Sequence, residues 1–145
     1  MNFELAFSAA SIVAMIGWII LLASPFIPIW SDRISGYVIP LVLSAGYVVL
    51  LVFSGDAEGG GFGSLAEVTT LFSYPDAVLA GWVHFLAFDL FIGAWQCRKA
   101  RAVGMRFWLV IPCLALTFLL GPLGLLLFFT LRAVPGVTIS NKVVA

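Results

Sequence analysis

The chain contains a single histidine, His84, which lies five positions before an aspartate, Asp89, in a long apolar segment. A charged aspartate at the centre of a membrane-spanning helix costs about 2.5 to 3.5 kcal/mol on insertion scales, so it needs a compensating partner or a function. Catalysis by proton transfer requires one acid and one base in a dry site. Asp89 and His84 are therefore the candidate catalytic residues.

Helix geometry separates these two side chains. Five residues rise about 7.5 Å and turn through about 140°, so His84 and Asp89 should face different neighbouring helices, or one of them should face a cavity. The structural alternative is that each residue holds helices together through Tyr47, Ser44 or Thr117. The sequence leaves both alternatives open.

Aromatic residues are dense, with 13 Phe, 5 Trp and 3 Tyr. In membrane proteins such residues ordinarily face lipid or pack between helices, and they would equally suit a slot for a long conjugated polyene. The candidate substrate-binding residues are aromatic or hydroxyl-bearing side chains of the apolar segments: Trp82, Phe88, Trp95, Tyr47 and Thr117.

Other kinds of site are not indicated. One histidine, with no second acid in the core of another segment, leaves too few ligands, so we expect no metal. The two cysteines, Cys97 and Cys113, give neither a disulfide framework nor a metal-binding spacing. A net charge of zero gives no clustered basic face for nucleic acid.

The composition indicates whether the chain folds in water or in a membrane. Of 145 residues, 63% are hydrophobic and 10% are charged, and the mean hydropathy is +1.16. Soluble domains carry about a quarter of charged residues to cover their surface. The composition therefore predicts an all-α integral membrane protein, built as a single domain over residues 1–145 and surrounded by lipid.

Four segments are long and apolar enough to cross a bilayer, which takes roughly 20 residues. They are residues 3–26, 35–53, 76–96 and 107–131, and we expect Pro122 to kink the last one. Between the second and third, Ser64-Leu65-Ala66-Glu67 forms a capping box. It predicts a short interfacial helix over residues 64–73, acting either as a connector or as a lid over a site below.

The basic residues predict the orientation. Four crossings place Arg33, Arg98, Lys99, Arg101 and Arg106 on one side and only Arg132 and Lys142 on the other. This bias places the short turns in the cytoplasm and both termini outside. The first apolar segment lacks the positive region of a signal peptide, and no transit segment precedes it. We therefore expect a multi-pass protein of a bacterial inner (plasma) membrane.

One pattern is specific enough to indicate a family. The third apolar segment contains Trp82-x-His84-x-x-Ala87-Phe88-Asp89-Leu90-Phe91-x-Gly93. With the residues 61–68 and the stretches 112–118 and 121–126, it resembles the abscisic-acid-deficient-four-like family of small four-helix membrane proteins. The resemblance implies a link to carotenoids, because the plant members are required for making the xanthophyll neoxanthin. It carries the family pattern to Trp82, His84, Asp89, Trp95 and Thr117.

The resemblance also implies a chemistry. Converting a 5,6-epoxide into an allene requires protonation of the epoxide oxygen and removal of a vinylic proton, with no net redox change and hence no nucleotide cofactor. Asp89 could be the acid and His84 the base, or the reverse; a ring cyclisation would need the same acid. The alternative is a non-catalytic subunit that binds carotenoid or steadies a pigment or enzyme complex, alone or as a homo-oligomer.

Overall fold

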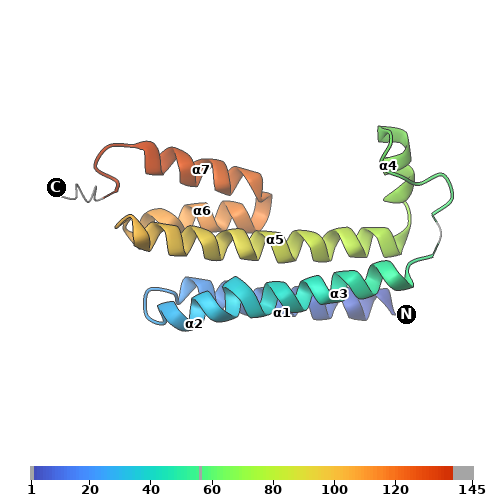
Figure 1. Cartoon of the computed structure of the whole chain (residues 1–145), viewed down its shortest axis with the longest axis horizontal. Helices are drawn as coiled ribbons and strands as arrows, with labels where there is room; N and C mark the ends of the chain where they lie inside the picture. The colour runs from blue at the N-terminus through green and yellow to red at the C-terminus, as the bar shows by residue number, and fades with distance from the viewer. Residues whose placement is uncertain (1, 56, 139–145) are drawn as a thin grey trace, which may run out of the picture.

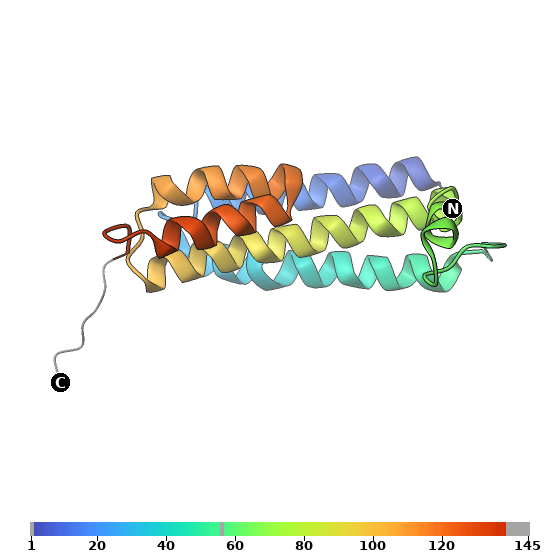
Figure 2. The same ribbon diagram turned by 90° about the horizontal axis from the view of Figure 1, so that it is seen from above.

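The computed structural model describes residues 2–55 and 57–138, and all regular structure in these residues is helical. The elements follow in the order α1 (Phe3–Leu22), α2 (Pro28–Arg33), a π-helical turn η1 (Ile34–Val38), α3 (Ile39–Phe53), α4 (Leu65–Leu71), α5 (Pro75–Ala102), α6 (Phe107–Leu120) and α7 (Pro122–Ala133). The helices form an elongated bundle, with α5 between the α1–α3 layer and the α6–α7 layer (Figures 1 and 2).

Three helical stretches are long and apolar enough to cross a membrane: Phe3–Leu22, Pro28–Phe53 and Pro75–Ala102. The second stretch is one continuous helix made of α2, η1 and α3, and it begins seven residues earlier than predicted because Pro28 is favourable at the first helical position. The third, α5, has 28 residues and extends beyond the predicted end at residue 96. The all-helical membrane architecture with these three long helices agrees with the sequence analysis.

The predicted fourth span, residues 107–131, is wrong as one continuous helix. The chain breaks at Gly121, whose φ of +38° is rarely adopted by L side chains, and it reverses into a second helix that starts at Pro122. The physical reason is that glycine allows the turn and proline cannot continue the ladder of α6. At about 21 Å and 18 Å, α6 and α7 are both shorter than the roughly 30 Å hydrocarbon core.

The small residues of this segment explain how the hairpin packs. A Cβ atom on Gly124 would overlap Thr117 and would lie 2.5 Å from the backbone oxygen of Cys113. Glycine therefore lets α7 lie directly on α6. Small residues commonly allow helices to approach each other closely, and the helix that approaches here is the returning half of the same segment.

The hairpin changes where the ends of the chain lie. Asn2 precedes α1 at one end of the bundle, whereas α7 finishes at the opposite end, beside the α5–α6 turn (Figures 1 and 2). The described ends of the chain therefore lie at opposite ends of the bundle, whereas four continuous spans would have brought both termini to the same end. The residues beyond 138, with Lys142, lie outside the described part of the chain.

The same arrangement sorts the charges. The chain has seven Lys and Arg residues. Six of them are in elements that end or turn at the α5–α6 end of the bundle: Arg33, Arg98, Lys99, Arg101, Arg106 and Arg132. Acidic residues mark the other end, namely Glu4, Glu58, Glu67 and Asp76. We call these the basic end and the acidic end of the bundle.

Candidate functional site

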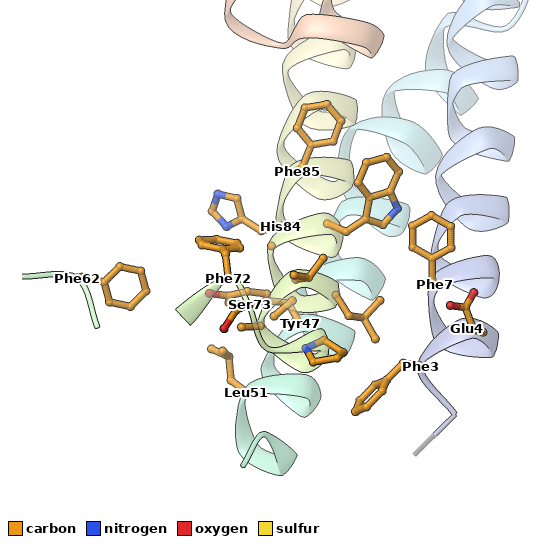
Figure 3. A pocket seen from close by; sticks show the side chains of 17 residues that line it. Phe3, Glu4, Phe7, Tyr47, Leu51, Phe62, Phe72, Ser73, His84 and Phe85 are labelled. Atoms are coloured by element: carbon orange, nitrogen blue, oxygen red, sulfur yellow. The ribbon is translucent and has the colours of Figure 1, made fainter. Parts of the chain in front are cut away.

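An open cavity of about 830 Å³ lies at the acidic end of the bundle, between α1, α3, α4 and the first three turns of α5. Its wall is mainly aromatic and aliphatic (Figure 3). The aromatic lining residues are Phe3, Phe7, Tyr47, Phe62, Phe72, Trp82 and Phe85, and the side chains with other polar groups are Glu4, Ser73 and His84. A large apolar cavity with a few polar groups is typical of a site for a small organic ligand.

His84 lies among aromatic rings in this cavity. Its imidazole stacks on Phe88 with the ring centroids 4.5 Å apart, and the Tyr47 ring is 5.8 Å away. Figure 3 shows Phe72, from the end of α4, beside His84. The imidazole is exposed in the described structure rather than buried in a helix interface, so a ligand in the cavity can reach it.

Trp82 forms another part of the wall and links α5 to α1. Its indole N–H donates a hydrogen bond to Ser11 Oγ at 3.0 Å. Its ring lies 5.3 Å from Phe7 and 5.7 Å from Phe85, measured between centroids. The tryptophan is thereby fixed in orientation and presents an aromatic face to the cavity.

Helix α4 borders the cavity, and local interactions define its start. Ser64 Oγ accepts a hydrogen bond from the Glu67 N–H, and the Glu67 carboxylate accepts one from the Gly63 N–H. The serine half of the predicted capping box is thus confirmed, whereas the glutamate binds one residue earlier than in the standard motif. Phe72 then packs on Gly81, where a Cβ atom would lie only 2.7 Å from the Phe72 ring.

Asp89 lies elsewhere. It is 7% exposed and faces the tip of the α6–α7 hairpin, where a Cβ atom on Gly121 would be 2.9 Å from Asp89 Oδ1. Its Oδ2 atom is buried and has no hydrogen-bond partner among the described residues. His84 and Asp89 are therefore on different faces of α5, as helix geometry predicted, and the structure does not bring them together as an acid–base pair.

Two further candidates lie at the interface between α5 and the hairpin, Trp95 on α5 and Thr117 on α6. Thr117 is fully buried, and its hydroxyl accepts a hydrogen bond from Gln96 Nε2 at 3.0 Å. Trp95 contacts the rings of Phe128 and Phe129, with centroids 5.5 Å and 5.6 Å apart. Neither residue lines the cavity at the acidic end, so both have a packing role between α5 and the hairpin in this structure.

Comparison with known proteins adds the family. The model of the ABA DEFICIENT 4-like (ABA4-like) family matches residues 5–128, which is most of the chain. The chain belongs to the ABA DEFICIENT 4-like family. Searches of curated proteins and of solved structures gave no match. Membership indicates a membrane protein related to carotenoids or xanthophylls.

The match to the ABA DEFICIENT 4-like family includes most of the cavity. Tyr47, Trp82 and His84 lie inside the matched residues, whereas Phe3 and Glu4 precede them. Sequence analysis missed Glu4 and Phe72 as lining residues. Phe72 lies within residues 64–73, for which an interfacial helix was predicted, so the possibility that this helix is a lid gave a signal for it. No sequence signal marked Glu4 as a cavity residue, because an acidic side chain in the first turn of a helix usually interacts favourably with the helix dipole.

Metal binding has no support in the described residues, in which no three His, Cys, Asp or Glu side chains could hold one ion. The polar groups at the cavity are instead an imidazole, a phenol, a carboxylate and a hydroxyl, from His84, Tyr47, Glu4 and Ser73. These groups can donate, accept or transfer protons beside an apolar ligand. Chemically, the site suits proton transfer on a hydrophobic molecule.

Proposed function

We propose that the cavity at the acidic end binds one end group of a carotenoid and isomerises it by acid–base catalysis. The observation that carries the proposal is the position of His84, exposed in an aromatic cavity next to the Tyr47 ring. The cavity is open, so the rest of the polyene can lie in the bilayer beside it. A hydrophobic substrate reaches such a site directly from lipid.

The reaction assigns one role to Tyr47 and another to His84. Tyr47 donates its hydroxyl proton to the epoxide oxygen as the C–O bond opens. His84 removes the proton from the adjacent vinylic carbon, whose electrons form the allene, and a proton then returns from His84 to Tyr47. Atoms and electrons balance without a redox cofactor. Asp89 does not line the cavity, so its role in this scheme is to seat the hairpin.

The proposed membrane arrangement follows from helix lengths and charges. The helices α1, α2–α3 and α5 cross the bilayer, and the α6–α7 hairpin enters it from the basic end without crossing. The basic end faces the cytoplasm of a bacterial cell, since Lys and Arg are enriched there in short loops. The cavity then opens near the opposite surface, with α4 lying at the interface above it.

A second function is supported by a different observation. The sequence-predicted pair of Asp89 and His84 is not assembled, and His84 stacks on Phe88 as a packing residue would. These contacts favour a non-catalytic protein that holds a carotenoid, as a homo-oligomer or as a subunit of a pigment or enzyme complex. In that case His84 contributes a ring surface and no proton.

The test is turnover by purified protein in lipid, supplied with epoxy-carotenoids or acyclic carotenoids and no nucleotide. The isomerase proposal expects product, with His84→Ala lowering the rate about 100-fold or more and Tyr47→Phe having a comparable effect. Both variants should retain bound pigment, because aromatic contacts hold the polyene. Bound, unchanged carotenoid across the whole substrate panel would instead establish the binding protein.

A further inference from the structure

The basic end of the bundle carries a second arrangement that the proposed function does not use. The guanidinium carbon of Arg98 lies 5.4 Å from the centroid of the Tyr37 ring and 5.9 Å from that of the Phe91 ring. Both rings are exposed, at 54% and 42%. Aromatic faces attract cations, most strongly where water is excluded, so the two rings stabilise the charge of the partly buried Arg98 side chain.

The backbone beside Arg98 is shaped to receive it. A Cβ atom on Gly36 would overlap Arg98 Nη1, so the absence of a side chain at Gly36 lets the guanidinium lie close to this turn in its present position. Gly36 belongs to η1, a π-helical turn between α2 and α3, and such turns are often found at functional sites. The Nη1 atom is buried and has no hydrogen-bond partner among the described residues.

The Arg98 charge has no carboxylate to balance it in the described part of the chain. At this end, Asp32 is paired with Arg101, and the remaining charges are positive. An arginine fork matches the oxygens of a phosphate group and binds them through charge-assisted hydrogen bonds. The unpaired positive charge of Arg98 therefore favours binding of an anion at this position.

The position of Arg98 identifies the source of that anion. Arg98 is one helical turn before the end of α5 at Ala102, and exposed apolar residues lie on the membrane side of it, including Val38 and Phe91. In the proposed membrane arrangement, on which this inference depends, Arg98 lies at the depth where headgroups meet acyl chains. We infer that Arg98, Tyr37 and Phe91 bind an anionic phospholipid, with the phosphate on the guanidinium and an acyl chain over Phe91.

The experiment measures lipid retention by native mass spectrometry of the purified protein, titrated with phosphatidylglycerol or phosphatidylcholine. We expect phosphatidylglycerol to bind about tenfold more tightly, as charge-assisted hydrogen bonds allow. Arg98→Gln should abolish this preference. Arg106→Gln makes the same charge change on an exposed residue of the α5–α6 turn and should leave the preference within about twofold, as expected for a screened surface charge.

A second variant guards against misfolding of Arg98→Gln. Combined Tyr37→Leu and Phe91→Leu substitutions keep every charge and should weaken phosphatidylglycerol binding several-fold. Equal loss in Arg98→Gln and Arg106→Gln would overturn the inference, because the lipid would then respond to net charge alone. Displacement of the lipid by inorganic phosphate would overturn it too, since the site would then bind the free ion. Carotenoid binding at the acidic end should be unchanged in all variants.

Discussion

The two ends of the bundle differ in how they use space. At the acidic end, α4 and the starts of α1 and α5 leave a cavity that exposes polar groups among aromatic rings. At the basic end, the α6–α7 hairpin fills the corresponding face of α5, and its contacts are close and largely apolar: Leu114, Val110 and Phe128 are at most 1% exposed. The acidic end therefore leaves an open cavity between its helices, whereas the interface between α5 and the hairpin is closed by packing.

The polar residues of α5 differ in their surroundings along the helix. His84, near the acidic end, is exposed to the cavity. Gln96, near the basic end, is fully buried, and its amide donates a hydrogen bond to the Thr117 hydroxyl. Asp89 lies between them and contacts the hairpin tip. A polar residue in a membrane helix is thus a functional candidate chiefly where its neighbours leave room around it.

The largest expected effect concerns which side of the membrane each end occupies. Single cysteines placed at Lys99, in the last turn of α5, and at Gly60, in the loop before α4, should label in an all-or-none manner from opposite sides. Lys99→Cys should be protected from an impermeant reagent in intact cells, whereas Gly60→Cys should react, because the proposed membrane arrangement places the basic end in the cytoplasm. Reaction of Lys99→Cys from outside would reverse the orientation of both ends.

The next effect tests the hairpin. Gly124→Ala places a Cβ atom against the backbone of α6, so we expect a loss of about 2 to 3 kcal/mol of stability, as overpacked cores show. Gly46→Ala is the matched control, because a Cβ atom there meets nothing within 4 Å. Thermal unfolding in detergent measures both. Equal stability of the two variants would show that α7 does not pack on α6 as closely as the structure has it.

The long helices and the placement of several polar residues could be predicted from the sequence, because they depend on interactions between residues close together in the chain. Hydropathy over 20 residues is enough to find α1, α3 and α5, because a membrane helix must satisfy its own backbone. The separation of His84 from Asp89 follows from 100° per residue alone. The capping serine of α4 is likewise a short-range signal, since Ser64 and Glu67 are three residues apart.

The errors arose where tertiary contacts decide between alternatives. Gly121-Pro122 is compatible both with a kink in one helix and with a reversal of the chain, and only the fit of Gly124 on Thr117 selects the reversal. That one choice moved the end of α7 to the basic end and thereby changed the predicted topology. The cavity could not be predicted from the sequence either, because Glu4, Phe72 and His84 line it from separate parts of the chain.

A smaller effect is expected where α4 borders the cavity. Phe72→Ala removes the ring that packs on Gly81 beside His84, so carotenoid affinity should fall several-fold, about 1 to 2 kcal/mol, while helix packing elsewhere is unchanged. Titration of apoprotein with pigment measures this. Phe53→Ala is the control, since that ring is 75% exposed and does not line the cavity. Equal affinity in both variants would show that α4 is only a connector.

The smallest effect is expected at Asp89, although burial of a carboxylate first made it a catalytic candidate. Asp89→Asn keeps the shape of the side chain beside Gly121 and replaces a buried carboxylate whose Oδ2 atom has no hydrogen-bond partner among the described residues. We expect turnover within about twofold of the unmodified protein and stability within about 1 kcal/mol. Rates are measured at equal amounts of folded protein. A folded Asp89→Asn variant without product would place Asp89 in the reaction, and the division of roles between the two ends would then fail.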